Sequence, residues 1–384
     1  MAEVILPESI IIFKNREMKK LLFIVLSTTF ILQSCLRDNE DPVSVSPIEG
    51  KITNPNVAGP TQPNQVWVDL SEVDAEGNPK QTLNRRTDWD LAFYSGDQFK
   101  VILNSSIVMA AGKIPNITDI NQVKESDVAV LKTKVQVANF DPSNVAYVDD
   151  VKGNFPISPT AISEIAINDV DNAVYLLNMG KDIYSGGVPV GSITTVGDDR
   201  GWMKIQITRS GSTAYKIKYA NVSDTSYKEY IINKNTDYNY SFFSLKNERE
   251  LLIQPQKEKW DLCFTVFTNV IEGAGTYIYG DFVLDNIMGG AASYQVTIPS
   301  NVNATEYYNN FKASDIDMSK FNYTDHRTIG ANWRNPVGTN GLETYGDRFY
   351  VLKDPEGFYF KIKFLRMTND QGVRGYPQFE YKPL

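Results

Sequence analysis

The chain has 384 residues, with 38 Lys and Arg against 46 Asp and Glu, a net charge of −8, one His and two Cys. An acidic chain without a cluster of basic residues is poorly suited to nucleic acid, because phosphate contacts need concentrated positive charge. A single His excludes a zinc site built from several His, and Ser–His–Asp or Cys–His catalysis would have to run through His326. No phosphate-binding loop or multi-ligand metal spacing occurs either. The composition therefore favours a protein that is not an enzyme.

An apolar run near the N-terminus predicts a lipoprotein signal. Lys19 and Lys20 precede the apolar segment 21–32, and Ser34 and Cys35 close it. A basic start, a short apolar core and a small residue before the cleavage point are the parts of a secretory signal. The ending Leu-x-x-Cys resembles a bacterial lipobox, in which the Cys is acylated. The run is too short to span a bilayer, although a buried helix is the alternative interpretation.

We expect residues 1–34 to be removed as a signal peptide, with Met18 as the natural start; a longer N-terminal region is the alternative. Acylation of Cys35 would then supply the only membrane attachment. The expected location is the outer membrane, and the acidic segment 38–41 resembles signals for exposure at the cell surface. Residues 35–65 are rich in Pro, Ser, Asn and Gly, and we expect the lipidated Cys to be followed here by a flexible tether.

From residue 66 onward the sequence predicts an all-β protein made of antiparallel sheets with few short helices. Short runs of Val, Ile, Thr, Tyr and Phe alternate with Gly, Asn, Asp and Pro breaks. Strict alternation of apolar and polar residues in 215–219 and in 360–364 indicates strands with one buried face. Helical patterns are expected only at 123–131 and at 304–312.

A short motif occurs twice. The residues Trp-Asp-Leu-Ala-Phe at 89–93 recur as Trp-Asp-Leu-Cys-Phe at 260–264. Each copy is preceded by a strand-like run, at 66–70 and at 240–245. In each copy the Trp can bury its ring while the Asp bonds loop backbone N–H groups, which makes the motif architectural.

We infer from this recurrence two related β units, 66–238 and 239–384, that diverged in their loops. Chance is the alternative, because each matching motif is short. Cys263 lies inside the second motif, and a packed, inert thiol is the expected state. With Cys35 lipidated, no intramolecular disulfide is possible.

At these residues the chain resembles the HmuY family of surface lipoproteins. The shared features are the lipobox, the polar tether, the Trp-Asp-apolar strand, a Gly-Gly segment, a Gly-x-x-Trp element, a final hairpin and a closing strand. The later features stand here at Gly289–Gly290, at Gly330–Trp333, at 348–364 and at 378–382. The resemblance is best over 240–384, and the upstream half resembles a longer branch of the family.

The resemblance implies HmuY-like antiparallel sheets and a haem-binding protein that serves iron acquisition. Such proteins capture haem outside the cell, free or from a haem-carrying host protein, and deliver it to an outer-membrane transporter. Haem iron with six ligands needs two axial donors, usually His or Met. The stretch after the Gly-x-x-Trp element has neither, so the candidate haem-binding residues are His326, Met288, Met318 and Tyr307.

Each candidate has an ordinary structural interpretation as well. His326 would be an exposed loop residue beside Asp325, and Met288 and Met318 would fill gaps in a core. Tyr307 is one of 21 Tyr residues, which suit any binding surface. A non-haem ligand-binding or adhesion lipoprotein on the same scaffold is therefore the alternative function.

Overall fold

The computed structural model describes residues 49–338 and 341–384, which belong to one compact unit, Ser46–Leu384. The predicted signal peptide at 1–34 and the lipidation site Cys35 lie outside the described residues. No helix in the described part of the chain is both long and apolar enough to cross a membrane. All of the strand pairs are antiparallel, which confirms the all-β prediction.

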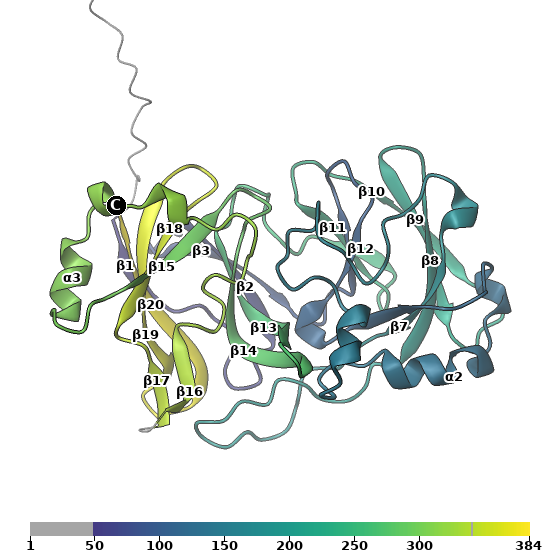
Figure 1. Ribbon diagram of the computed structural model, residues 1–384, viewed down its shortest axis with the longest axis horizontal. Helices are drawn as coiled ribbons and strands as arrows, with labels where there is room; N and C mark the ends of the chain where they lie inside the picture. Colours follow the sequence, from purple (N-terminus) through teal and green to yellow (C-terminus); the bar gives the residue numbers. More distant parts are fainter. Residues whose placement is uncertain (1–48, 339–340) are drawn as a thin grey trace, which may run out of the picture. The chain divides into compact units, whose positions relative to one another are not determined.

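Four sheets form the body of the protein (Figure 1). Sheet I has the order β10 (Lys228–Asn233), β9 (Ala214–Asn221), β8 (Trp202–Arg209), β7 (Val174–Asn178), β6 (Ala110–Lys113). Sheet II has the order β12 (Arg249–Leu251), β11 (Tyr240–Ser244), β4 (Leu91–Tyr94), β5 (Val101–Leu103). Sheet III has the order β14 (Gly275–Asp285), β13 (Leu262–Ile271), β2 (Asn64–Val73), β3 (Pro79–Arg85). Sheet IV has the order β1 (Lys51–Thr53), β20 (Arg374–Pro383), β19 (Tyr359–Thr368), β18 (Arg348–Lys353), β15 (Ala292–Thr297).

The remaining elements are short. A two-stranded ribbon joins β16 (Arg334–Gly338) to β17 (Gly341–Thr344). The expected helices are present as α2 (Glu125–Lys134) and α3 (Ala304–Asn310). Short 3-10 helices are η1 (Ser105–Ile107), η2 (Ile120–Gln122), η3 (Pro142–Tyr147), η4 (Asp169–Asp171), η5 (Ala313–Asp315) and η6 (Met318–Lys320).

The inner strands β4 of sheet II and β13 of sheet III are buried on both faces. Leu91 and Phe93 face a core shared with sheet I, whereas Ala92 between them faces sheet III. In the same way Leu262 belongs to the core shared with sheet IV, and its neighbour Cys263 faces sheet II. Because both faces must be apolar, these strands read as continuous hydrophobic runs rather than as alternating ones. The layers therefore follow the order I, II, III, IV.

Strands from the two predicted units pair with each other across residue 239. The strand after the first Trp-Asp motif, β4, pairs with β11, and the strand after the second, β13, pairs with β2. The neighbouring strands follow, because β3 pairs with β2 and β12 pairs with β11. Each unit thus contributes its first two strands to a sheet of the other unit. The units are not separate bodies, and their duplication stays a proposal, which this reciprocal pairing supports.

The repeated motif makes matching hydrogen bonds in the two halves. A carboxylate oxygen of Asp90 accepts from the Leu245 N–H at 2.7 Å, and one of Asp261 accepts from the Leu70 N–H at 2.6 Å. An Asn side chain then donates to the Trp carbonyl in each half, Asn104 to Trp89 at 2.8 Å and Asn286 to Trp260 at 2.7 Å. The motif is architectural. Asp90 bonds a turn N–H as the sequence predicts, whereas Asp261 bonds an N–H inside β2.

The two Asp residues differ in their charged neighbours. Asp90 forms a buried ion pair with Arg200, 2.7 Å apart. Asp261 instead lies near the carboxyl groups of Asp69 and Asp354, and burial together with these like charges raises its pKa well above the ordinary value. Burial also raises the pKa of Asp354, to about 6. This corner of the second half therefore favours protonated carboxyl groups.

Replacing Asp354 with Asn should stabilise the protein more at pH 8 than at pH 5. The folded-state pKa of about 6 lies above the ordinary 3.8, so the contribution of Asp354 to stability is present below about pH 4 and is lost as the pH rises through 6. Asn abolishes that loss and can still accept the 2.7 Å hydrogen bond from the Phe358 N–H. Urea unfolding midpoints at the two pH values measure the effect. Asp370→Asn, whose side chain is 82 % exposed, is the matched control; equal shifts at both pH values for Asp354→Asn would contradict the expectation.

The predicted tether is too long at its C-terminal end. Lys51–Thr53 form β1 at the edge of sheet IV, Val57 is 3 % exposed, and the Gln62 amide donates to Asp281 at 2.6 Å. The Pro- and Asn-rich composition gave no sign of this ordered segment. Strand β1 is held mainly by backbone pairing, and the buried positions are single residues between polar ones.

Candidate ligand pocket

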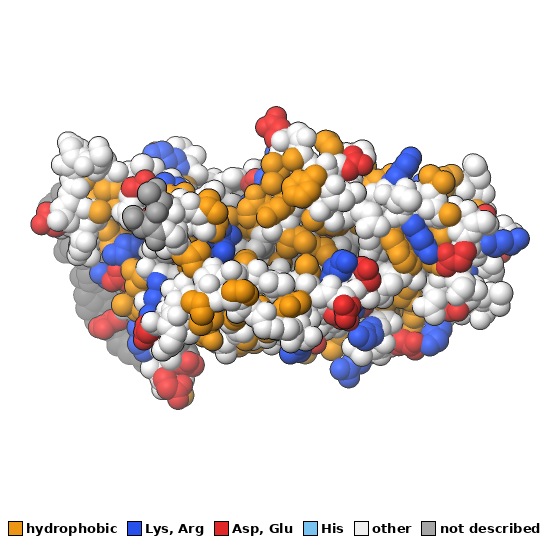
Figure 2. Space-filling view, turned by 90° about the horizontal axis from the view of Figure 1, so that it is seen from below, with side chains coloured by type: hydrophobic (Ala, Val, Ile, Leu, Met, Phe, Trp, Pro, Cys, Tyr) orange, Lys and Arg blue, Asp and Glu red, His pale blue; other side chains and the backbone are white. Residues whose placement is uncertain are grey.

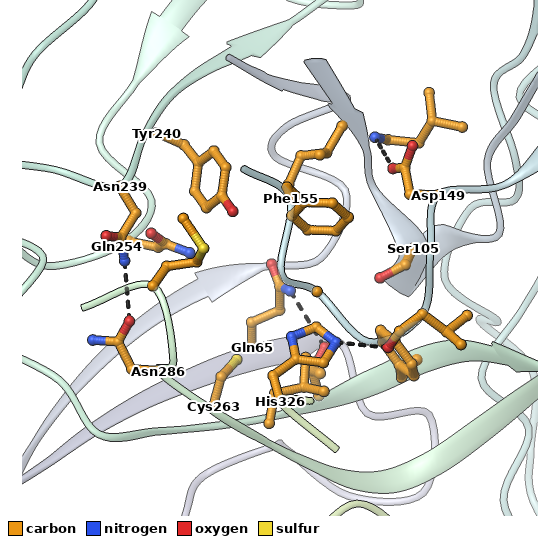
Figure 3. Close-up of a pocket in the computed structure, with 18 of the residues that line it drawn as sticks. Gln65, Ser105, Asp149, Phe155, Asn239, Tyr240, Gln254, Cys263, Asn286 and His326 are labelled. Carbon is orange, nitrogen blue, oxygen red and sulfur yellow. Dashed lines mark hydrogen bonds between the residues drawn. The ribbon is translucent and has the colours of Figure 1, made fainter. Parts of the chain in front are cut away.

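An apolar pocket of about 110 Å³ lies between the facing surfaces of sheets II and III (Figure 3). Strand alternation supplies its walls, because every second residue of β2, β13 and β11 points to this side. The aromatic residues that line it are Trp67, Trp89, Phe155, Tyr240, Phe242, Trp260 and Phe267. Most of them belong to one hydrophobic cluster that also includes Cys263 and Met288. Large rings that are held on rigid strands make a preformed site for an apolar ligand.

Edge-to-face ring contacts fix the indoles of this pocket. Trp67 meets Trp260 with the ring centroids 4.7 Å apart, and Trp89 meets Phe242 at 4.9 Å. The indole N–H of Trp67 donates to the Asn84 side chain at 2.8 Å. These contacts position the aromatic wall before any ligand arrives.

His326 lies at the pocket and not on an exposed loop, which corrects the structural interpretation of the sequence. Its Nε2 is 3.0 Å from the Val151 carbonyl oxygen, and its ring packs edge-on against Phe267 at 5.4 Å. Nδ1 is covered by Gly153, where an added Cβ would come within 2.3 Å. This enclosure disfavours the imidazolium and lowers the pKa of His326 to about 4, so the ring is neutral near pH 7. Asp325, its sequence neighbour, bonds Arg327 instead.

The other candidate residues divide into two groups. Met288 lines the same pocket as His326. Met318 is 58 % exposed in η6, and Tyr307 lies on α3 with its ring 6.4 Å from that of Phe349 on β18. Only His326 and Met288 are therefore brought to one pocket.

Apart from His326, the ionisable acidic and basic side chains among the described lining residues are carboxyl groups. Asp149, Asp150 and Asp285 are among its lining residues, and no Lys or Arg of the described chain is. Both oxygens of Asp149 are occupied, by the Leu103 N–H at 2.7 Å and the Ala161 N–H at 2.9 Å, and burial raises its pKa to about 7.

Asp285 and Cys263 offer no reactive group to a ligand. Asp285 pairs with Leu262, so its side chain turns toward sheet IV, where it accepts from the Ser293 hydroxyl at 2.5 Å. Burial raises its pKa to about 7. Burial also raises the pKa of the Cys263 thiol well above the ordinary value, which keeps it protonated.

Several pocket residues were missed by reasoning from the sequence. Tyr240, Gln254 and the segment 148–155 line the pocket, yet none of them carries a motif. The apolar residues on both faces of strands 91–94 and 262–264 were the available signal, because such strands must be covered on two sides. The face in Figure 2 shows hydrophobic side chains near its middle with acidic and basic ones interspersed around them.

The fold is that of an all-antiparallel-β protein whose two inner sheets enclose an aromatic pocket. The chain belongs to the HmuY family, whose model, described as HmuY protein, matches residues 61–381. No curated protein matches the chain.

Two solved structures show similarity. One, described as a candidate lipoprotein from Bacteroides fragilis, is 12 % identical with a TM-score of 0.21. The match covers 46 % of this chain and 92 % of the other chain. The other, described as a candidate HmuY-like heme binding protein from Bacteroides vulgatus, is 13 % identical with a TM-score of 0.20. The match covers 47 % of this chain and 91 % of the other chain.

Proposed function

We propose that the chain is a non-catalytic, lipid-anchored protein of the outer-membrane surface that binds haem and delivers it for iron acquisition. The observation that carries this proposal is that His326 and Met288, two residue types that ligate haem iron, line one aromatic pocket in a member of the HmuY family. The lipid on Cys35 would be the only membrane attachment. Haem or a haem-carrying host protein and an outer-membrane transporter would be the partners.

The donor types fit haem, but the closed pocket does not. Pockets for drug-sized ligands run to roughly 300–1,000 Å³, whereas this one has about 110 Å³. Nε2 of His326 is engaged by Val151, and Gly153 covers Nδ1. Haem binding therefore requires that the segment 148–155 move away from His326.

A hemin titration followed in the Soret region tests the proposal. We expect a saturable spectral change with the wild type and at least about a tenfold weaker Kd, about 1.4 kcal/mol, with His326→Gln, because Gln cannot ligate iron as an imidazole does. Equal urea midpoints of the two proteins would exclude a folding defect as the cause. A wild type without a saturable spectral change would contradict haem binding.

A non-haem ligand on the same scaffold is the second candidate. It is favoured by the size of the pocket and by the absence of Lys and Arg among its described lining residues, since the propionates of haem are anionic. Adhesion through exposed aromatic side chains belongs to the same candidate, and a screen of glycans and host proteins in the absence of hemin tests it.

A further inference from the structure

The two halves of the protein place an indole at matching positions beside the pocket. In the first half, the N–H of Trp89 donates to the side-chain oxygen of Gln65 at 2.8 Å. The strand registers pair Trp67 with Cys263 in sheet III and Phe242 with Ala92 in sheet II. Cys263 and Ala92 occupy the same place in the two Trp-Asp motifs, so their strand partners Trp67 and Phe242 correspond to each other. Gln65 and Tyr240, each two residues earlier, therefore also correspond.

This exchange of Gln for Tyr leaves one indole without an acceptor. Trp260, the counterpart of Trp89, is 5 % exposed, and its Nε1 has no hydrogen-bond partner. Oε1 of Gln254, another lining residue, also has none. Figure 3 shows the Tyr240 hydroxyl directed into the pocket on the same side as Gln254. A buried donor and acceptor without partners are costly, and a ligand that bonds both would remove that cost.

The charges around the pocket select against an anion. Asp149 and Asp150 place carboxyl groups at the pocket, and no described Lys or Arg lines it to balance the charge of a carboxylate ligand. Each of these carboxyl groups already accepts hydrogen bonds from the protein: Asp149 from two backbone N–H groups, Asp150 from the Lys152 N–H, and Asp285 from Ser293 on the side of sheet IV. The ligand that fits this environment is uncharged.

The volume of the pocket sets the size of the ligand. An engineered cavity of about 150 Å³ lined by apolar side chains binds benzene, and this pocket has about 110 Å³ within an aromatic wall. We propose that the pocket contains a subsite for an uncharged single-ring ligand with a hydroxyl group, a phenol, whose oxygen accepts from Trp260 and whose proton is donated to Gln254. This rests on the proposed function only in that the pocket binds a ligand; it does not require haem.

Calorimetric titration of the full-length protein with phenol, toluene and benzoate tests the subsite. Phenol and toluene have nearly the same shape, so their affinities differ through the hydroxyl alone. We expect phenol to bind saturably, with a Kd at least about tenfold lower than that of toluene, and benzoate to show no saturable binding. Toluene binding as tightly as phenol, or benzoate binding more tightly than either, would overturn the proposal.

Trp260→Phe and Trp202→Phe form a matched pair of variants. The first removes the unpartnered N–H and should bring the phenol-to-toluene affinity ratio close to one. The second replaces an indole of β8 that does not line the pocket and should keep the wild-type ratio. A ratio retained in Trp260→Phe would refute the role of its N–H, and the wild-type ligand series decides alone if that variant fails to fold.

A hemin titration of the same preparation separates this proposal from the proposed function. Hemin binding without phenol binding would refute the subsite and leave haem binding standing. Phenol binding without hemin binding would support the subsite and refute haem as the ligand. No saturable binding of either would refute both.

Discussion

Replacing Arg86 with Met should lower the free energy of unfolding by about 3 kcal/mol or more. Arg86 is 1 % exposed and has no carboxylate partner in the described structure; its guanidinium donates to backbone carbonyl oxygens of Gln62 and Thr195 at 2.6 Å, of Thr61 at 3.3 Å, and of Ser106. Each buried carbonyl left without a donor costs about 1–3 kcal/mol. Relief from burying the cation, which lowers the pKa of Arg86 to about 9, offsets part of the sum.

Urea denaturation followed by tryptophan fluorescence measures this change. Arg85→Met is the matched control, because Arg85 is the exposed neighbour of the same residue type, and its effect should stay within about 0.5 kcal/mol. Similar midpoints for the two variants would show that the four carbonyl groups find other partners and that Arg86 does not hold the loops at 61–62, 106 and 195 together.

Replacing Arg200 with Met should cost about 3–5 kcal/mol, because it leaves the buried charge of Asp90 without a partner. The side chains of Asp90 and Arg200 are 0 % and 3 % exposed. Asp90 also accepts the Leu245 N–H, so its carboxylate cannot turn away without losing the bond that joins β4 to the exchanged strand β11.

A second substitution separates the loss of charge compensation from the loss of packing. The double variant Arg200→Met/Asp90→Asn removes both charges and can keep the bond from Leu245, so it should recover part of the stability. Arg366→Met, which breaks the exposed pair with Asp370, should cost at most about 1 kcal/mol. No recovery in the double variant would assign the destabilisation to packing of the Arg200 side chain.

Local structure followed from local sequence. The alternation at 215–219 and 360–364 correctly predicted the strands β9 and β19, and the segments 123–131 and 304–312 correctly predicted α2 and α3. The predicted exposed face of β19 is wrong at Lys361, which is 4 % exposed because α3 covers it and accepts from its ammonium group. The backbone-bonding role of the motif Asp was also predictable, although only Asp90 bonds a turn N–H, and Asp261 bonds one within β2.

Long-range pairing could not be read from the same residues. Two similar hairpins fit either Trp-Asp strand by local pattern alone, so nothing in 66–70 or 240–245 indicates that each pairs with the other half. The pocket could not be predicted from the sequence for the same reason, because its walls come from segments that are distant in the chain. His326 is enclosed by residues 151–153, which are far from it in sequence and are polar enough to read as an exposed loop.

The two methionines proposed as haem ligands test the central claim most directly, because Met288 lines the pocket and Met318 is exposed on η6. The measurement is the hemin affinity, from Soret titrations, of wild type, Met288→Leu and Met318→Leu. We expect saturable binding by the wild type, at least about a tenfold weaker Kd with Met288→Leu, about 1.4 kcal/mol, and no change with Met318→Leu. Absence of saturable binding by the wild type, or equal affinities of all three proteins, would contradict haem ligation in the pocket between sheets II and III.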